Sequence, residues 1–168
     1  MRSILRWNLL IILALDWGLL VGCGGQQNEL ETSFSQSKQQ VEINKLTDFQ
    51  MKNGIGPVTK TIELGSIDSK LAKKGELLFR LNCSACHELD ARLVGPAQRN
   101  VTERRSPEYI LNMILNPAGM LKIHPDAQKM LADFMTPMPK QNVNRSEARA
   151  ILEYFRFMDR HKNKVEVN

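Results

Sequence analysis

The feature that most constrains this chain is the run Cys83-Ser84-Ala85-Cys86-His87. It holds two of the three cysteines of the 168-residue chain, followed at once by a histidine. A thioredoxin-like redox motif would need a strand–helix–strand context, which the sequence lacks. A zinc site would need two more ligands at short spacing, and only His124 and His161 remain, far along the chain.

The pattern CxxCH is typical of covalent haem attachment. Two thiols at this spacing, at a helix end, can reach the two vinyl groups of one porphyrin. The histidine that follows then lies on the axial direction of the iron. The sequence therefore predicts one covalently attached haem c, with Cys83 and Cys86 as the attachment residues and His87 as an axial iron ligand.

Helical patterns flank this motif. Apolar spacing near 3.6 predicts a helix over 68–83, capped by Asp68 or Ser66. A last helix is expected from Asn144 to about Arg160, with Glu147 completing a capping-box arrangement.

Two shorter helices are expected between these, beginning at Ser106-Pro107 and at Pro125-Asp126, and Asn116-Pro117 is expected to end the first of them. The sequence shows no persistent alternation of apolar and polar residues, so no strands are expected. The fold class is therefore all-α, with about four helices over residues 66–162 and a C-terminal tail over 163–168. A domain of this size has a thin core, which a haem would complete.

Residues 83–97, CSACHELDARLVGPA, resemble the haem-binding stretch of small bacterial class I cytochromes c. The resemblance implies that the carbonyl of Pro96 accepts a hydrogen bond from Nδ1 of His87, which fixes the tautomer and orientation of the ring. It also implies that the first and last helices cross near a glycine and aromatic side chains. The residues that fit such a crossing are Gly75, Phe79, Ile151 and Tyr154 or Phe155.

Residues 135–139, MTPMP, resemble the Pro-Met-Pro loop that carries the axial methionine in this family. The resemblance implies that Met138 is the second iron ligand. Met135 and His124 remain alternatives, as does an open coordination position. Four nearby arginines are candidates to pair with a haem propionate, and the sequence does not distinguish among Arg92, Arg99, Arg104 and Arg105.

The first 22 residues have the pattern of a secretory signal, with Arg2 and Arg6 before an apolar run. Asp16 interrupts that run and disfavours a stable membrane span. The segment ends in Leu20-Val21-Gly22-Cys23, which resembles a bacterial lipobox and implies lipidation of Cys23. An ordinary cleaved signal and an uncleaved anchor are the alternatives.

Residues 23–65 are expected to form a lipid-anchored tether. Residues 24–45 hold few apolar groups and cannot bury a core. Residues 54–65, GIGPVTKTIELG, differ, because Val58, Ile62 and Leu64 allow an extended strip to pack against the following domain.

The family resemblance implies a one-electron carrier, not an enzyme, with no small-molecule substrate. It implies a place in the bacterial periplasm, membrane-anchored through Cys23. The expected partners are an upstream quinol-oxidising complex or cytochrome and a downstream reductase or oxidase. The stretches VTERRSPEYILNMILNP and EARAILEYF resemble cytochrome domains of periplasmic respiratory reductases, including nitrous oxide reductase systems.

Two other functions remain open at this point. One is a haem-based sensor or small peroxidase with a labile distal ligand, and the other is a structural or assembly lipoprotein. Nucleic acid is not an expected partner, because the net charge of +5 is modest and scattered and makes no long basic stripe.

Overall fold

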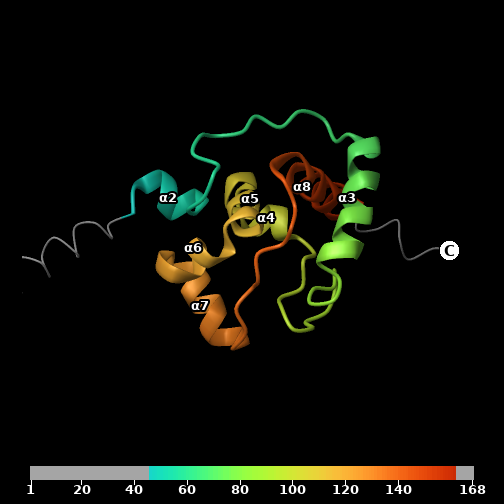
Figure 1. Cartoon of the computed structure of the whole chain (residues 1–168). Coiled ribbons are helices and arrows are strands. Elements are labelled where there is room, and N and C mark those ends of the chain that lie inside the picture. The colour runs from blue at the N-terminus through green and yellow to red at the C-terminus, as the bar shows by residue number, and fades with distance from the viewer. Residues whose placement is uncertain (1–45, 162–168) are drawn as a thin grey trace, which may run out of the picture. The chain divides into compact units, whose positions relative to one another are not determined.

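A computed structural model of the chain describes residues 46–161. The expected signal peptide, Cys23, the C-terminal tail and tether residues 24–45 lie outside this range. Residues 46–161 form helices joined by loops, without strands (Figure 1). None of these helices is both long enough and apolar enough to cross a bilayer. The helices are α2 (Asp48–Asn53), α3 (Ser69–Asn82), α4 (Val101–Arg104), α5 (Pro107–Leu115), α6 (Pro117–Ile123), α7 (Pro125–Phe134) and α8 (Arg145–Arg160).

The all-α prediction is confirmed, and the four expected helices are α3, α5, α7 and α8. Their starts follow the predicted caps. The Asp68 side chain accepts hydrogen bonds from the backbone N–H groups of Lys70 and Leu71. Asn144 and Glu147 form the complete capping box of α8. Local sequence chemistry therefore sets where these helices begin.

Three short helices were not predicted, and α6 shows why. Asn116-Pro117 does end α5, as expected, but Pro117 then opens α6 as its first residue. Proline suits that position, because its missing N–H would have no partner within the helix. The chain therefore turns at Asn116 and continues as helix.

The closest helix packing is the crossing of α3 and α8. A Cβ built on Gly75 would lie 1.9 Å from the backbone oxygen of Ala150, so only glycine allows this approach. One turn along α3, the Phe79 ring lies 5.7 Å from the ring of Tyr154 and 5.6 Å from that of Phe155. The predicted crossing near Gly75 and these aromatic residues is confirmed.

The folded part begins earlier than the expected boundary at residue 66. Residues 48–53 form α2, and residues 54–68, here called the strap, run from α2 across to the start of α3 (Figure 1). Val58 in the strap is only 1% exposed. The tether prediction for 46–65 thus differs from the structure, although packing of 54–65 had been anticipated.

Buried polar side chains on the helices hold the strap. Asn112 of α5 accepts a hydrogen bond from the Val58 N–H at 2.9 Å and donates to the carbonyls of Asn53 and Val58. Glu108, also on α5, accepts one from the Ile62 N–H at 2.6 Å. In a sheet, the backbone N–H and C=O groups of an extended segment form hydrogen bonds with a neighbouring strand. In the strap, these groups form hydrogen bonds with helix side chains, so the extended segment can lie against helices.

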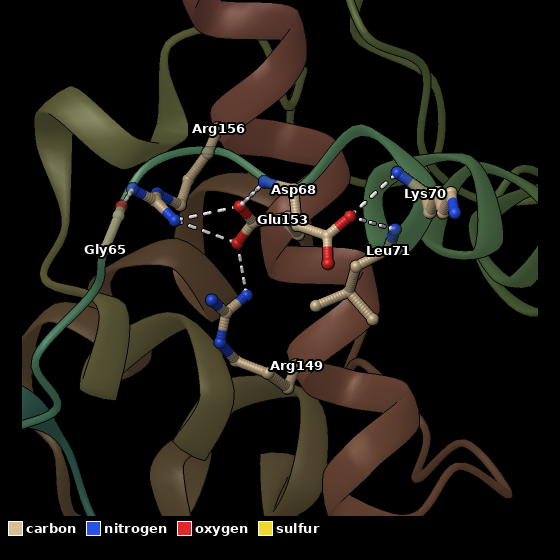
Figure 2. A network of polar contacts seen from close by, with 7 residues as sticks. All are labelled: Gly65, Asp68, Lys70, Leu71, Arg149, Glu153 and Arg156. Atoms are coloured by element: carbon tan, nitrogen blue, oxygen red, sulfur yellow. Dashed lines mark hydrogen bonds and ion pairs between the residues drawn. The ribbon is translucent and has the colours of Figure 1, made fainter.

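Glu153 makes the corresponding contact at the end of the strap (Figure 2). Its fully buried carboxylate accepts a hydrogen bond from the Asp68 N–H at 2.9 Å and pairs with Arg149 and Arg156. Arg156 also donates to the Gly65 carbonyl at 2.7 Å. Burial alone would raise the pKa of Glu153, but the Asp68 N–H and the two arginines outweigh it and hold the pKa below its ordinary value of 4.5.

Glu153→Gln is expected to destabilise the holoprotein at pH 7 by about 3 kcal/mol, because it removes the partner of two arginines beside a buried site. Since the folded-state pKa is lowered, the contribution of the charge is present above pH 4.5 and is lost as pH falls below it. The gap in melting temperature between wild type and variant should therefore narrow below pH 4.5. A gap that does not change with pH would contradict this account.

Candidate haem site

The two cysteines follow the end of α3 directly. Cys83 caps the helix, its N–H donating to the Phe79 carbonyl at 2.8 Å. The N–H groups of Cys86 and His87 then both donate to the Cys83 carbonyl, at 3.0 and 2.9 Å. This tight turn brings the two half-buried thiols and the imidazole to the wall of one cavity.

The state of the Cys83 thiol argues against a thiol-redox role. Burial, and then the neighbouring Cys86, raises the pKa of Cys83 to about 11. The free thiol is therefore protonated at neutral pH, whereas redox-active CxxC motifs lower a cysteine pKa to favour the thiolate.

The His87 ring is held by the loop after it. Nδ1 lies 2.9 Å from the carbonyl oxygen of Pro96. A carbonyl only accepts, so Nδ1 carries the hydrogen, and in the neutral ring the lone pair then lies on Nε2, the form of histidine that binds a metal. Gln98, which the sequence did not single out, places Nε2 2.8 Å from both His87 Nδ1 and the Pro96 carbonyl. Because His87 Nδ1 is a donor, Gln98 donates to the carbonyl.

Gly95 lets the ring lie this close to the loop backbone. A Cβ at this position would be 2.3 Å from Cε1 of His87. The loop is fixed by the Gly95 N–H, which donates to the Cys86 carbonyl at 2.8 Å, and by the Gln98 N–H, which donates to the Glu88 carbonyl at 2.9 Å. The His87 orientation therefore depends on a glycine and a proline carbonyl in one rigid turn.

Met138 lines the same cavity, together with Thr136, Pro137 and Pro139. The two alternative ligands do not. Met135 ends α7 with φ +56° and is 84% exposed. His124 is 1% exposed and places its Nε2 3.1 Å from the Met51 carbonyl, away from the cavity lining. His124 had been expected at a helix cap or the surface; it occupies the N-cap position of α7 but makes no capping hydrogen bond and is buried.

The cavity has a volume of about 450 Å³, in the range of cofactor pockets. Its walls are mainly apolar, as a porphyrin face requires. Tyr109 lines it, and the buried hydroxyl of this tyrosine has no hydrogen-bond partner. Burial raises the pKa of Tyr109, and the nearby Arg105 opposes that effect. An unpaired buried donor fits a cavity built for a group with polar substituents.

The structure also separates the four candidate arginines. Arg104 and Arg105 line the cavity, and Arg105 pairs with Asp126. Arg99 forms an ion pair with Asp90 at 2.6 Å and does not line the cavity. Arg92 lies over the Phe134 ring and donates to the Asp133 carbonyl, linking the loop after His87 to the end of α7.

Comparison with known proteins agrees with this geometry. The family model described as cytochrome c matches residues 72–158. This chain belongs to the cytochrome c family. Cytochrome c-551 of Stutzerimonas stutzeri is 31% identical over 85 residues, which are 50% of this chain and 76% of that protein.

Solved structures lead to the same family. Cytochrome c from Rhodothermus marinus is 43% identical, with a TM-score of 0.64 over 68% of this chain and 99% of that one. An engineered form of the Rhodothermus protein gives 44% identity and a TM-score of 0.62 over 66% of this chain and 96% of that one. As a cytochrome c, the chain carries one covalently attached haem c and acts as a haem-based electron carrier with redox partner proteins. Bacterial cytochromes c of this type are typically extracytoplasmic.

Gly95→Ala is expected to displace the His87 ring, because the added methyl group cannot fit beside Cε1 without a shift of the loop. Absorption spectra of the purified holoprotein should show a larger high-spin ferric fraction or a lower yield of covalent haem. Gly65→Ala is the matched control, since nothing lies within 4 Å of a Cβ there. Equal spectra for both variants would contradict the role assigned to Gly95.

Proposed function

We propose that this cytochrome c is a membrane-tethered electron carrier in a bacterial respiratory chain, with His87 and Met138 as the axial iron ligands and Cys83 and Cys86 as the haem attachment residues. The observation that carries the proposal is the cavity itself, to which distant parts of the sequence bring these four side chains. The haem, when bound, supplies the one-electron couple of its iron.

Residues around the two proposed axial ligands hold those ligands in fixed positions. The Pro96 carbonyl orients His87 and fixes its tautomer. Pro137 and Pro139 restrict the backbone on both sides of Met138, which a weak, neutral thioether ligand requires. If His87 and Met138 remain iron ligands in both oxidation states, the coordination of the iron changes little during electron transfer. A methionine–histidine ligand pair also raises the reduction potential relative to stronger donors.

The polar end of the cavity suits the haem carboxylates. Arg104, Arg105 and the unpaired Tyr109 hydroxyl are the candidates to receive them, since these groups line the cavity and Arg92 and Arg99 do not. This assignment narrows the four arginines to two.

The surface near the attachment site suits a protein partner. Leu77 and Leu81, one turn apart on α3, are 56% and 73% exposed, and Leu93 in the loop after His87 is also exposed. The nearby basic residues Lys73, Lys74 and Arg80 would favour a partner with an acidic rim and speed its encounter. A terminal reductase or oxidase, with nitrous oxide reductase systems among the candidates, is the proposed acceptor, and a quinol-oxidising complex or another cytochrome the proposed donor.

Met138→Ala tests the ligand assignment. It should abolish the far-red ferric absorption band of sulfur–iron ligation and lower the reduction potential, whereas Met135→Ala should leave both unchanged, because Met135 points to solvent. Wild-type protein with high-spin haem would favour the sensor or peroxidase function instead. A Met138→Ala strain with normal respiratory electron flux would contradict the carrier role and favour a structural lipoprotein.

Cys23→Ser tests the tether. On fractionation of cells, the variant should appear in the soluble extracytoplasmic fraction and no longer in the membrane fraction, because serine lacks the sulfur atom that would carry the lipid. Ser33→Ala, in the same segment, is the control and should remain with the membrane. Retention of the Cys23→Ser protein in the membrane would indicate an uncleaved anchor.

A further inference from the structure

Two separate apolar clusters wall the haem cavity. The larger one joins α3, α5 and α8 and contributes Phe79, Ile110 and Ile151, among others, to the lining. The second, here called the small cluster, has three buried members within residues 46–161, namely Tyr109, Met120 and Ala127. Partly buried Ile55, Met113, Leu121 and Met130 pack against them.

The small cluster borders the cavity that Met138 also lines. Tyr109 of this cluster lines the cavity, as do Met113, Leu121 and Met130, which pack against the cluster. They come from α5, α6 and α7, and α7 runs directly into residues 135–139. A cluster with so few buried side chains contributes little packing energy by itself. The position of Met138 therefore depends on what else holds α6 and α7.

The strap and α2 supply that support from the outer side. The Ile55 N–H donates to the Met120 sulfur at 3.0 Å, and the Asn116 side chain donates to the Ile55 carbonyl at 3.0 Å. At the α6–α7 junction, the buried His124 places Nε2 3.1 Å from the Met51 carbonyl of α2. Helix α6 thus lies between the strap and the cavity.

Gly54 packs directly against Met120 of α6. Its φ of +77° is in the region that favours glycine, and a Cβ there would lie 2.7 Å from both Cε and Sδ of Met120. Met120 itself has no exposed surface. A shift of the strap at this point must therefore displace the buried Met120 side chain or the helix that carries it.

We propose that α2 and strap residues 54–56 act as a brace that holds α6 and α7 in place and so keeps Met138 on the haem iron. Gly54, Ile55, Met120 and His124 are positioning residues in this device. It rests on the proposed ligation by Met138. A neutral thioether competes weakly with other ligands, so its occupancy is set by how often the loop opens. The brace lowers the fraction of molecules in which the Met138 loop is open, and the apparent affinity of the haem iron for an external ligand falls in proportion.

The experiment measures imidazole binding to the full-length ferric holoprotein by absorption. Gly54→Ala should tighten apparent imidazole binding at least about fivefold and weaken the far-red band without removing it. Met120→Leu keeps the apolar volume but removes the sulfur acceptor, and it should shift the affinity in the same direction by a smaller factor. This second variant serves if Gly54→Ala does not fold.

Two controls separate positioning from general destabilisation. Gly65→Ala lies in the same strap, where nothing is within 4 Å of a Cβ, and should bind imidazole as the wild type does. Glu153→Gln lowers the melting temperature through α8 and the far end of the strap, and it should also leave imidazole binding unchanged.

The outcomes distinguish the two proposals. If wild-type protein lacks the far-red band, Met138 is not the ligand and the proposed ligation fails. If the band is present and Gly54→Ala and Met120→Leu bind imidazole as tightly as the wild type, the ligation stands and the brace is overturned. If Glu153→Gln tightens binding as much as Gly54→Ala does, the effect is one of global stability, and the brace is likewise overturned.

Discussion

The fold depends on the backbone contact between α3 and α8 at Gly75. Because the two helices touch there without an intervening side chain, the direction of α3 is fixed relative to the largest amphipathic helix of the domain. Cys83 caps the end of α3, so the same contact sets where Cys83, Cys86 and His87 emerge. The aromatic cluster of Phe79, Tyr154 and Phe155 fills the space just before that point.

The rest of the domain is held by a different kind of interaction. Asn112, Glu108 and Glu153 are buried polar side chains that pair with backbone groups of the strap. Each such group would be costly to bury alone, so the strap and the helices require each other. The helices and the loops between them line the cavity, and the strap lies against those helices without lining it.

Much of the site could be predicted because its chemistry is local in the sequence. The CxxCH motif, the turn ending in Pro96 and the caps of α3 and α8 are each read from neighbouring residues. The boundary at residue 66 could not be, since the contacts of Val58 and Ile62 are made with residues far along the chain. Neither Gln98 beside His87 nor the burial of His124 leaves a periodic signal, because both follow from tertiary packing.

The order of elements along the chain also determines how the domain bears a mechanical load. A force applied to the chain ahead of residue 46 acts first on α2 and then on the strap. It would act on the turn after α3 only after both had detached from the helices. The side-chain contacts to Met51, Asn53, Ile55 and Val58 lie in series along that path. If the protein were anchored ahead of residue 46, these contacts would have to break one after another before a force on the chain reached the turn after α3.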